Sequence, residues 1–370
     1  MKITNVKIYK NGSFETGEIG IENDRFTTPA ADDSNVIDGG GLMAIPGLCD
    51  LHFHGAVGAD ISDGDVEGVK KMVAYEHSHG ITTVNPATMT LSEEQLIKAV
   101  RSAVEAGGVD GIYLEGPFIS PNKVGAQNPD YVKNPDGPML KRIMDAADGL
   151  VDFCALAPET QGAIEFIKEF KDQIGISVAH TTADFDTAQA AFDAGAKQIT
   201  HMYNAMPPLH HRSPGVIGAA SDSSHVSAEI ICDGVHIHPS AIRAAFRLFG
   251  PERMIFISDT MRAVGLKDGE YTLGGQAVIK EGPLATLKGS DTIAGSATNL
   301  YDCMKFAVQQ VGIPLTDAIR CASENPAKAI GKFDQVGSID IGKRADLLLV
   351  DSDLNLKKIF AAGVEVPVGE

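Results

Sequence analysis

The chain has 370 residues, of which 44% are hydrophobic and 22% charged, and its formal net charge at pH 7 is −18. These fractions are those of an ordinary globular protein, and they exclude the disordered and collagen-like classes. The negative charge argues against nucleic acid and anionic membranes as partners, because both are bound by concentrated positive surfaces.

The amino-terminal sequence MKITNVKIYKNG lacks the apolar segment of a signal peptide, and no stretch approaches the roughly 18 apolar residues of a membrane span. The five cysteines are far apart and form no C-x-x-C pair. This spacing disfavours a disulfide framework or a thiolate zinc site. We therefore expect a cytoplasmic protein with no membrane partner.

Residues 1–42 contain short β-rich runs, KITNVKIYK and EIGIEN, separated by turn residues, which predicts strands without intervening helices. From about residue 43 the pattern changes, and β-rich runs alternate with helical stretches. The expected helices cover residues 65–79, 92–106, 138–147, 184–194 and 239–248, with a further helix that ends near residue 171.

Eight strands are expected in this part of the chain. Most are continuous apolar runs, which are typical of parallel strands buried on both faces. Because most are also followed by a helix, the pattern favours an α/β fold of the (β/α)8 TIM-barrel type. The runs are LMAIPGLCDLHFHG, TTVNPAT, GIYLEGPFI, VDFCALAPE, ISVAHT, QITHMYNA, SAEIICDG and MIFISDT.

The segment 265–293 is rich in glycine and threonine and predicts a hairpin insertion after the eighth strand, before a helix that starts near residue 296. The end of the chain returns to short strands, in ADLLLVD and LKKIFAAGVEV. We therefore expect residues 1–42 and 340–370 to form a small β-sandwich domain beside a barrel domain of residues 43–339.

Metal-capable side chains follow the ends of different predicted strands, where barrel enzymes build their active sites. His52 and His54 form an H-x-H pair. Side chains two residues apart on a strand point to the same side, so the two imidazoles can bind one divalent ion. The alternative is that they only satisfy backbone acceptors.

Glu115, His180 and His201 each lie at the end of an apolar run. A carboxylate at such a place is costly to bury unless it is paired or binds a metal. Neutral imidazole is a good ligand for zinc or iron. Each residue also has a plainer interpretation, an exposed carboxylate or a core histidine, but together they form a ligand set that leaves positions for water and substrate.

Asp259 follows the last predicted barrel strand, in IFISDTM. A carboxylate here could accept a proton from a water on the metal and deliver it to a leaving amine. It could also simply cap the loop that follows. The combination of all these groups on one barrel rim is far more specific than any single member.

Several longer motifs occur in a characteristic order: H-x-H, LEGPFISPNKVGAQ, AHTTAD, THMYNAMPPLHHRSPGVIGAA, CDGVHIHP and SDTM, then AGSATNL, SENPAKAIG and GSIDIGKRADLLLVD. Over essentially its whole length the chain thereby resembles the N-acetylglucosamine-6-phosphate deacetylases of the amidohydrolase superfamily. The resemblance implies a metal-dependent barrel enzyme of amino-sugar catabolism that removes the acetyl group of N-acetylglucosamine 6-phosphate.

The resemblance also implies roles for individual residues. Glu115, His180 and His201 would hold the principal divalent ion, and Asp259 would be the catalytic acid and base. The H-x-H pair can hold a second ion bridged by Glu115, although some members work with one. Zinc and iron are the expected metals.

For the substrate, the resemblance implies contacts from Asn204, the backbone of Ala205, Arg212 and His236, with a homodimer partner contributing to the site. Arginine supplies a planar fork for phosphate, and a local positive pocket is needed against the acidic field of the protein. Where some members carry a histidine after LEGPF, this chain has Gln127, which cannot become cationic and is expected to hydrogen-bond a hydroxyl or the acetyl group.

Two alternatives stay open on the sequence. The first is another amide hydrolase of the superfamily, such as a cyclic amidase or a deacetylase for N-acetylgalactosamine 6-phosphate. LEGPF and the stretch from Asn204 to Arg212 argue for a phosphorylated amino sugar. The second is a non-catalytic sugar-phosphate-binding barrel, against which the presence of Asp259 with every candidate metal ligand counts.

Overall fold

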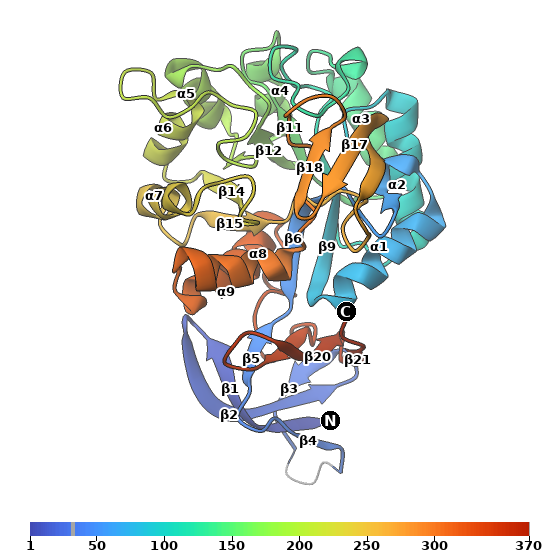
Figure 1. Ribbon diagram of the computed structural model, residues 1–370, viewed down its shortest axis with the longest axis vertical. Helices are drawn as coiled ribbons and strands as arrows, with labels where there is room; N and C mark the ends of the chain where they lie inside the picture. Colours follow the sequence, from blue (N-terminus) through green and yellow to red (C-terminus); the bar gives the residue numbers. More distant parts are fainter. Residues whose placement is uncertain (31–33, 370) are drawn as a thin grey trace.

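The main body of the molecule is a barrel of parallel strands surrounded by helices (Figure 1). The computed structural model describes residues 1–30 and 34–369. The eight barrel strands lie in the order β15-β14-β13-β12-β11-β10-β9-β6, so each pairs with its neighbour in the chain. The amide of Asp259 donates to the carbonyl of His52 at 3.0 Å and links the last strand to the first. The predicted (β/α)8 barrel is confirmed.

Each barrel strand overlaps one of the runs predicted as strands. Their side chains alternate between the interior of the barrel, where Leu51, Tyr113 and Phe153 belong to one buried cluster, and the layer beneath the helices. The strands are β6 (Leu48–Phe53), β9 (Ile81–Thr88), β10 (Ile112–Leu114), β11 (Val151–Leu156), β12 (Gly175–Val178), β13 (Gln198–Ile199), β14 (Ser227–Ile231) and β15 (Met254–Ile257).

The helices predicted between the strands are present. Most begin where an aspartate or serine side chain accepts a hydrogen bond from the first turn, as Asp65 and Ser92 do. The sequence did not predict α6 (Gly215–Asp222), which is short, contains two glycines and has no side-chain cap. The predicted helices are α1 (Val66–Ser78), α2 (Glu93–Ala106), α3 (Gly137–Ala146), α4 (Ala163–Phe170), α5 (Phe185–Ala194) and α7 (Pro239–Phe249).

The segment after β15 forms an antiparallel sheet of three strands, so the predicted hairpin insertion has one strand more than a simple hairpin. The helix expected from about residue 296 begins at Leu300, with Asn299 as its cap. These elements are β16 (Gly269–Leu273), β17 (Gln276–Glu281), β18 (Leu284–Leu287), α8 (Leu300–Phe306), α9 (Leu315–Ala322) and α10 (Glu324–Ala329).

The two ends of the chain build a second sheet, which lies at one end of the molecule (Figure 1). Its order is β21-β20-β19-β5-β1-β2-β3, with β4 paired to β1, and it encloses its own apolar cluster around Ile3, Phe26 and Phe360. The strands are β1 (Lys2–Lys10), β2 (Ser13–Glu22), β3 (Arg25–Thr27), β4 (Val36–Asp38), β5 (Met43–Pro46), β19 (Leu347–Val350), β20 (Leu356–Ala361) and β21 (Val364–Val366).

The separate β domain expected from the chain ends as a small β-sandwich is therefore present, and its strands form one continuous sheet. The domain limits at residues 42 and 340 stay a prediction. The strand β5 lies just beyond the first limit and pairs with β1 and β19. Within residues 1–30 and 34–369, no helix is both long enough and apolar enough to cross a bilayer.

Candidate metal centre

The polar residues predicted as a site all follow barrel strands at their carboxyl ends. His52 lies within β6 and His54 directly after it, and Glu115 follows the last residue of β10. Because the parallel strands run in one direction around the barrel, these ends meet at the same face. The other members stand two residues beyond their strands: His180 after β12, His201 after β13 and Asp259 after β15.

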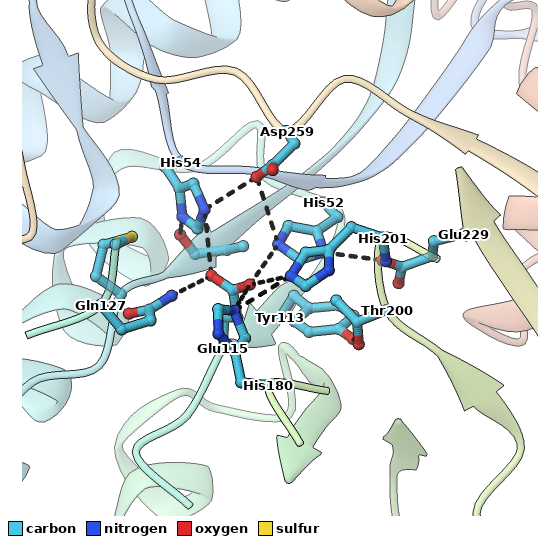
Figure 2. Close-up of polar contacts among 12 residues, drawn as sticks. His52, His54, Tyr113, Glu115, Gln127, His180, Thr200, His201, Glu229 and Asp259 are labelled. Atoms are coloured by element: carbon cyan, nitrogen blue, oxygen red, sulfur yellow. Dashed lines mark hydrogen bonds and ion pairs between the residues drawn. The ribbon is translucent and has the colours of Figure 1, made fainter. Parts of the chain in front are cut away.

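Glu115 lies at the centre of the cluster, and imidazole rings surround its carboxylate (Figure 2). Its Oε1 atom is 2.9 Å from Nε2 of His201 and 3.0 Å from Nε2 of His180. Its Oε2 atom is 3.3 Å from Nε2 of His54. Potential ligand atoms of Glu115, His180 and His201 all lie within 4.8 Å of one another, a spacing that a single metal ion can span.

A second group of potential ligands consists of His52, His54 and Asp259, again with ligand atoms within 4.8 Å of one another. Asp259 Oδ1 is 3.2 Å from Nε2 of His54 and 3.8 Å from Nε2 of His52. Glu115 faces both groups, since its Oε1 is also 3.6 Å from Nε2 of His52. The arrangement can therefore accommodate one ion or two ions bridged by this carboxylate.

Two of the rings are oriented by acceptors on their far side. Nδ1 of His54 lies 2.8 Å from the carbonyl oxygen of Ala87, and Nδ1 of His180 lies 2.9 Å from that of Lys123. A carbonyl can only accept, so each Nδ1 carries a proton. In the neutral tautomer the lone pair is then on Nε2, the atom that faces Glu115, as a metal ligand requires.

Both carboxylates of the centre are held in the charged form. Burial by itself would raise the pKa of Glu115, but the neighbouring imidazoles, His52 most strongly, lower that pKa well below its usual value. Burial likewise raises the pKa of Asp259, and the hydrogen bond to His54 with the nearby imidazole charges brings it below the usual value. Ionised carboxylates suit both metal binding and proton acceptance.

Three of these residues adopt a backbone conformation that side chains rarely take. His180, His201 and Asp259 have φ of 42°, 31° and 52°, in the left-handed region. Such strain, on the order of 1–3 kcal/mol per residue, persists only where the surrounding structure imposes it, and it is concentrated at functional sites. Here the left-handed turn lies immediately beyond the carboxyl end of each strand.

A cavity of about 350 Å³ opens onto the cluster, a volume suited to a small ligand. Asn204, Ala205 and His236, predicted as substrate contacts, line it together with the metal candidates. The inserted sheet and the loop after it supply part of the lining. The residues that complete the lining are Met89, Gly125, Ala126, Leu273, Asp291, Thr292, Ile293 and Gly295.

Gln127 and Arg212 are placed differently from the other predicted substrate contacts, because neither lines the cavity. The Gln127 side chain is buried, with Nε2 donating to Oε2 of Glu115 at 2.5 Å and Oε1 accepting from the amide of Thr90 at 2.7 Å. Both ends of its amide are therefore used by the protein. Arg212 is exposed, and its guanidinium lies 2.9 Å from Nε2 of His211.

Two carboxylates that support the site were not predicted. Glu229 in β14 is fully buried and lies 3.0 Å from Nδ1 of His52 (Figure 2). Asp233 accepts from Nδ1 of His236 at 2.7 Å. The sequence could have indicated Glu229, because an acidic residue within the apolar run SAEII is costly to bury without a partner.

A (β/α)8 barrel whose strand ends gather carboxylates and imidazoles around one small cavity defines a metal-dependent hydrolase of the barrel class. The chain belongs to the amidohydrolase family, whose sequence pattern matches residues 43–366.

Named relatives cover nearly the whole chain. N-acetylglucosamine-6-phosphate deacetylase from Bacillus subtilis is 35% identical over 363 residues, which are 94% of this chain and 91% of that protein. N-acetylgalactosamine-6-phosphate deacetylase from Escherichia coli O157:H7 is 32% identical and covers 87% of each chain. A Mycobacterium smegmatis N-acetyl-D-glucosamine-6-phosphate deacetylase, solved in complex with N-acetyl-D-glucosamine-6-phosphate, is 34% identical with a TM-score of 0.93 over 99% of both chains.

Proposed function

We propose that this chain hydrolyses the N-acetyl group of N-acetylglucosamine 6-phosphate and gives glucosamine 6-phosphate and acetate. The observation that carries the proposal is the contact of Glu115 with Nε2 of His180 and His201, at 3.0 and 2.9 Å, at the base of the cavity. The activity named for the relatives over nearly the full chain supports the same substrate.

The residues of the centre fit a divalent ion. One carboxylate and two imidazoles form a donor set suited to zinc or iron, and we propose that Glu115, His180 and His201 hold the principal ion. The buried Nε2 of His52 has no hydrogen-bond partner, which is unfavourable unless a further ligand occupies the space it faces. We propose that the H-x-H pair can hold a second ion there.

A divalent ion in this position would polarise the acetamide carbonyl and lower the pKa of the attacking water. Asp259 takes a proton from that water and returns it to the amide nitrogen, so that one water is added across the C–N bond as the bond breaks. His236 lines the same cavity and donates a hydrogen bond to the carbonyl oxygen as negative charge develops on it.

The phosphate end of the substrate calls for a lysine or arginine, and neither belongs to the described lining of the cavity. Arg212 is exposed on the loop that follows β13. We propose that the protein is a homodimer in which Arg212 and the partner subunit complete the phosphate site, while Asn204 and the backbone of Ala205 contact the sugar phosphate from this chain. Gln127 then acts by holding Glu115.

A cytoplasmic location is also part of the proposal. The five cysteines, Cys49, Cys154, Cys232, Cys303 and Cys321, are all free and buried. Unpaired thiols are usual in a reducing compartment. None of these cysteines belongs to either group of potential metal ligands, because both groups consist of histidines and carboxylates.

The proposal is tested by acetate release from the protein loaded with zinc or with ferrous iron. N-acetylglucosamine 6-phosphate, its galacto epimer and unphosphorylated N-acetylglucosamine are compared at equal concentration. We expect fastest release from the first and little from the unphosphorylated sugar. Faster release from the galacto epimer would contradict the proposed substrate, and no release from any of the three would contradict the reaction.

Asp259→Asn should keep the principal ion at Glu115, His180 and His201 and bind the sugar phosphate while turnover falls by about 10²–10⁴-fold, because proton transfer is removed. Metal content and substrate affinity are measured beside acetate release. Unchanged turnover in a variant with normal metal content would show that another group carries the proton.

A further inference from the structure

Glu229 is a fully buried carboxylate inside the barrel that the proposed reaction does not use. It lies on β14, and its side chain lies beside His52 and His201 at the edge of the metal centre (Figure 2). A buried carboxylate is tolerated when N–H donors satisfy its oxygens. The identity of those donors indicates what this residue does.

Three groups donate to Glu229. Its Oε1 accepts from the side-chain amide of Gln198 at 2.5 Å. Its Oε2 lies 3.0 Å from Nδ1 of His52 and accepts from the backbone amide of His201 at 3.2 Å. The same oxygen, Oε2, therefore contacts the ring of His52 and the backbone amide of His201. His52 belongs to one group of potential metal ligands and His201 to the other, so this atom links the two groups.

The contact with His52 fixes which ring nitrogen can bind a metal. Glu229 is a carboxylate and can only accept, so Nδ1 of His52 carries a proton and Nε2 is left facing Glu115 Oε1 at 3.6 Å and Asp259 Oδ1 at 3.8 Å. This Nε2 is buried and has no hydrogen-bond partner. The ring is also stacked on Tyr113, with centroids 4.6 Å apart.

Among the imidazoles of the centre, His52 is the one supported by a charge. His54 and His180 use backbone carbonyls at the same ring position, which a side-chain substitution would leave in place. A carboxylate behind a metal-binding histidine both orients the ring and increases its basicity, and loss of such a partner typically costs 10- to 100-fold in metal affinity.

We propose that Glu229 is a positioning residue for the metal centre, which holds His52 with Nε2 toward the ion and aligns it with the backbone of His201. The inference rests on the proposed metal-dependent function. It assigns to Glu229 no contact with substrate.

The test measures zinc binding to metal-free wild type, Glu229→Leu and Glu229→Gln by competition with a chromophoric chelator, with the number of bound ions from elemental analysis. We expect affinity to fall at least 10-fold in Glu229→Leu, or one bound ion to be lost. Glu229→Gln should be intermediate, because its amide oxygen can accept one N–H but carries no charge. Wild-type affinity and stoichiometry in Glu229→Leu would overturn the proposal.

Glu76→Gln is the matched control, since Glu76 on α1 is also fully buried, but neither of its carboxylate oxygens has a hydrogen-bond partner among the described residues. Its zinc affinity should equal that of wild type, and an equal loss in this variant would overturn the specific role of Glu229. If Glu229→Leu does not fold, Glu229→Gln decides: zinc affinity below that of both wild type and Glu76→Gln is the expected result, and wild-type affinity and stoichiometry in Glu229→Gln would overturn the proposal.

A second readout follows the His52 ring directly. In zinc-loaded protein labelled with 15N-histidine, the Nδ1 proton of His52 should be protected from exchange and should be lost or shifted in both Glu229 variants but not in Glu76→Gln. Acetate release is measured separately. Wild type that binds zinc and releases no acetate would contradict the proposed function alone, and active wild type with unaltered Glu229 variants would contradict this inference alone.

Discussion

The properties of His236 depend on a carboxylate three residues earlier in the chain. Asp233 accepts from Nδ1 of His236 at 2.7 Å and from the amides of Val235 and His236. Burial lowers the pKa of His236, but the hydrogen bond and charge of Asp233 outweigh it and raise that pKa above its usual value. The imidazole is therefore charged over a wider pH range than an unperturbed histidine, at the wall of the cavity.

Asp233→Asn should reduce stability by an amount that depends on pH, on the order of 1–3 kcal/mol. Burial raises the pKa of Asp233, but its contacts with His236 outweigh burial and lower that pKa below its usual value. The contribution of Asp233 to folding stability is therefore present above the unfolded-state pKa of about 4 and is lost as pH falls through the folded-state pKa. The pKa of His236 is raised, so its contribution is present below about pH 6.5 and lost as pH rises through the folded value.

The difference in Tm between wild type and Asp233→Asn should thus be largest between about pH 4 and 6.5 and shrink on both sides. Thermal melts across this range check the expectation. Asp148→Asn, at an exposed position, serves as the control. A difference that does not vary with pH would show that the pair of Asp233 and His236 is not its source.

At the scale of elements, the inserted sheet of β16, β17 and β18 holds a loop from another part of the barrel. The Gln276 side chain in β17 donates to the carbonyl oxygens of Ala126 and Gln127, at 2.7 and 3.1 Å. Gln127 in turn contacts Glu115. The insertion therefore contributes to the cavity wall and also supports the residue behind the central carboxylate.

Gln276→Ala should loosen this loop, because two hydrogen bonds, each of about 1 kcal/mol, are removed. We expect faster amide hydrogen exchange in residues 120–128 and a KM for the sugar phosphate raised several-fold. Mass spectrometry of exchange and steady-state kinetics measure the two effects. Gln309→Ala, which removes a similar contact to Asp353 far from the cavity, should change neither.

At the scale of the whole molecule, the site exists only because the barrel closes. The potential metal ligands come from five strands that span residues 48–257 of the chain, and the link from Asp259 to His52 brings the last strand to the first. An ion bound by residues from several strands stabilises the folded chain relative to the unfolded one.

Removal of metal should therefore lower Tm, and zinc at 100 times its Kd should restore about 2.7 kcal/mol. Melting curves in chelator and in buffered zinc measure the effect. Glu115→Gln should melt at nearly the same temperature in both conditions, because its central ligand is weakened. Equal Tm values for wild type with and without metal would contradict binding of an ion at this centre.

The sequence by itself determined the barrel and the face on which its site lies. Continuous apolar runs followed by helices predicted the strands, and polar residues at their ends had to share one rim because all the strands are parallel. The helix caps at Asp65 and Ser92 involve only residues two or three positions apart, so local sequence was enough to predict where these helices begin. Local sequence was not enough to predict α6, because this helix consists largely of small residues and has no side-chain cap.

Only the tertiary structure decided how the site residues are held. Glu229 is 177 positions from His52, and no local pattern joins residues so far apart. Gln127, expected to face the substrate, has both ends of its amide engaged by Glu115 and Thr90, and Arg212 lies outside the cavity. Hydrogen-bond partners depend on how separate strands and loops pack, whereas strand periodicity depends only on neighbours in the chain.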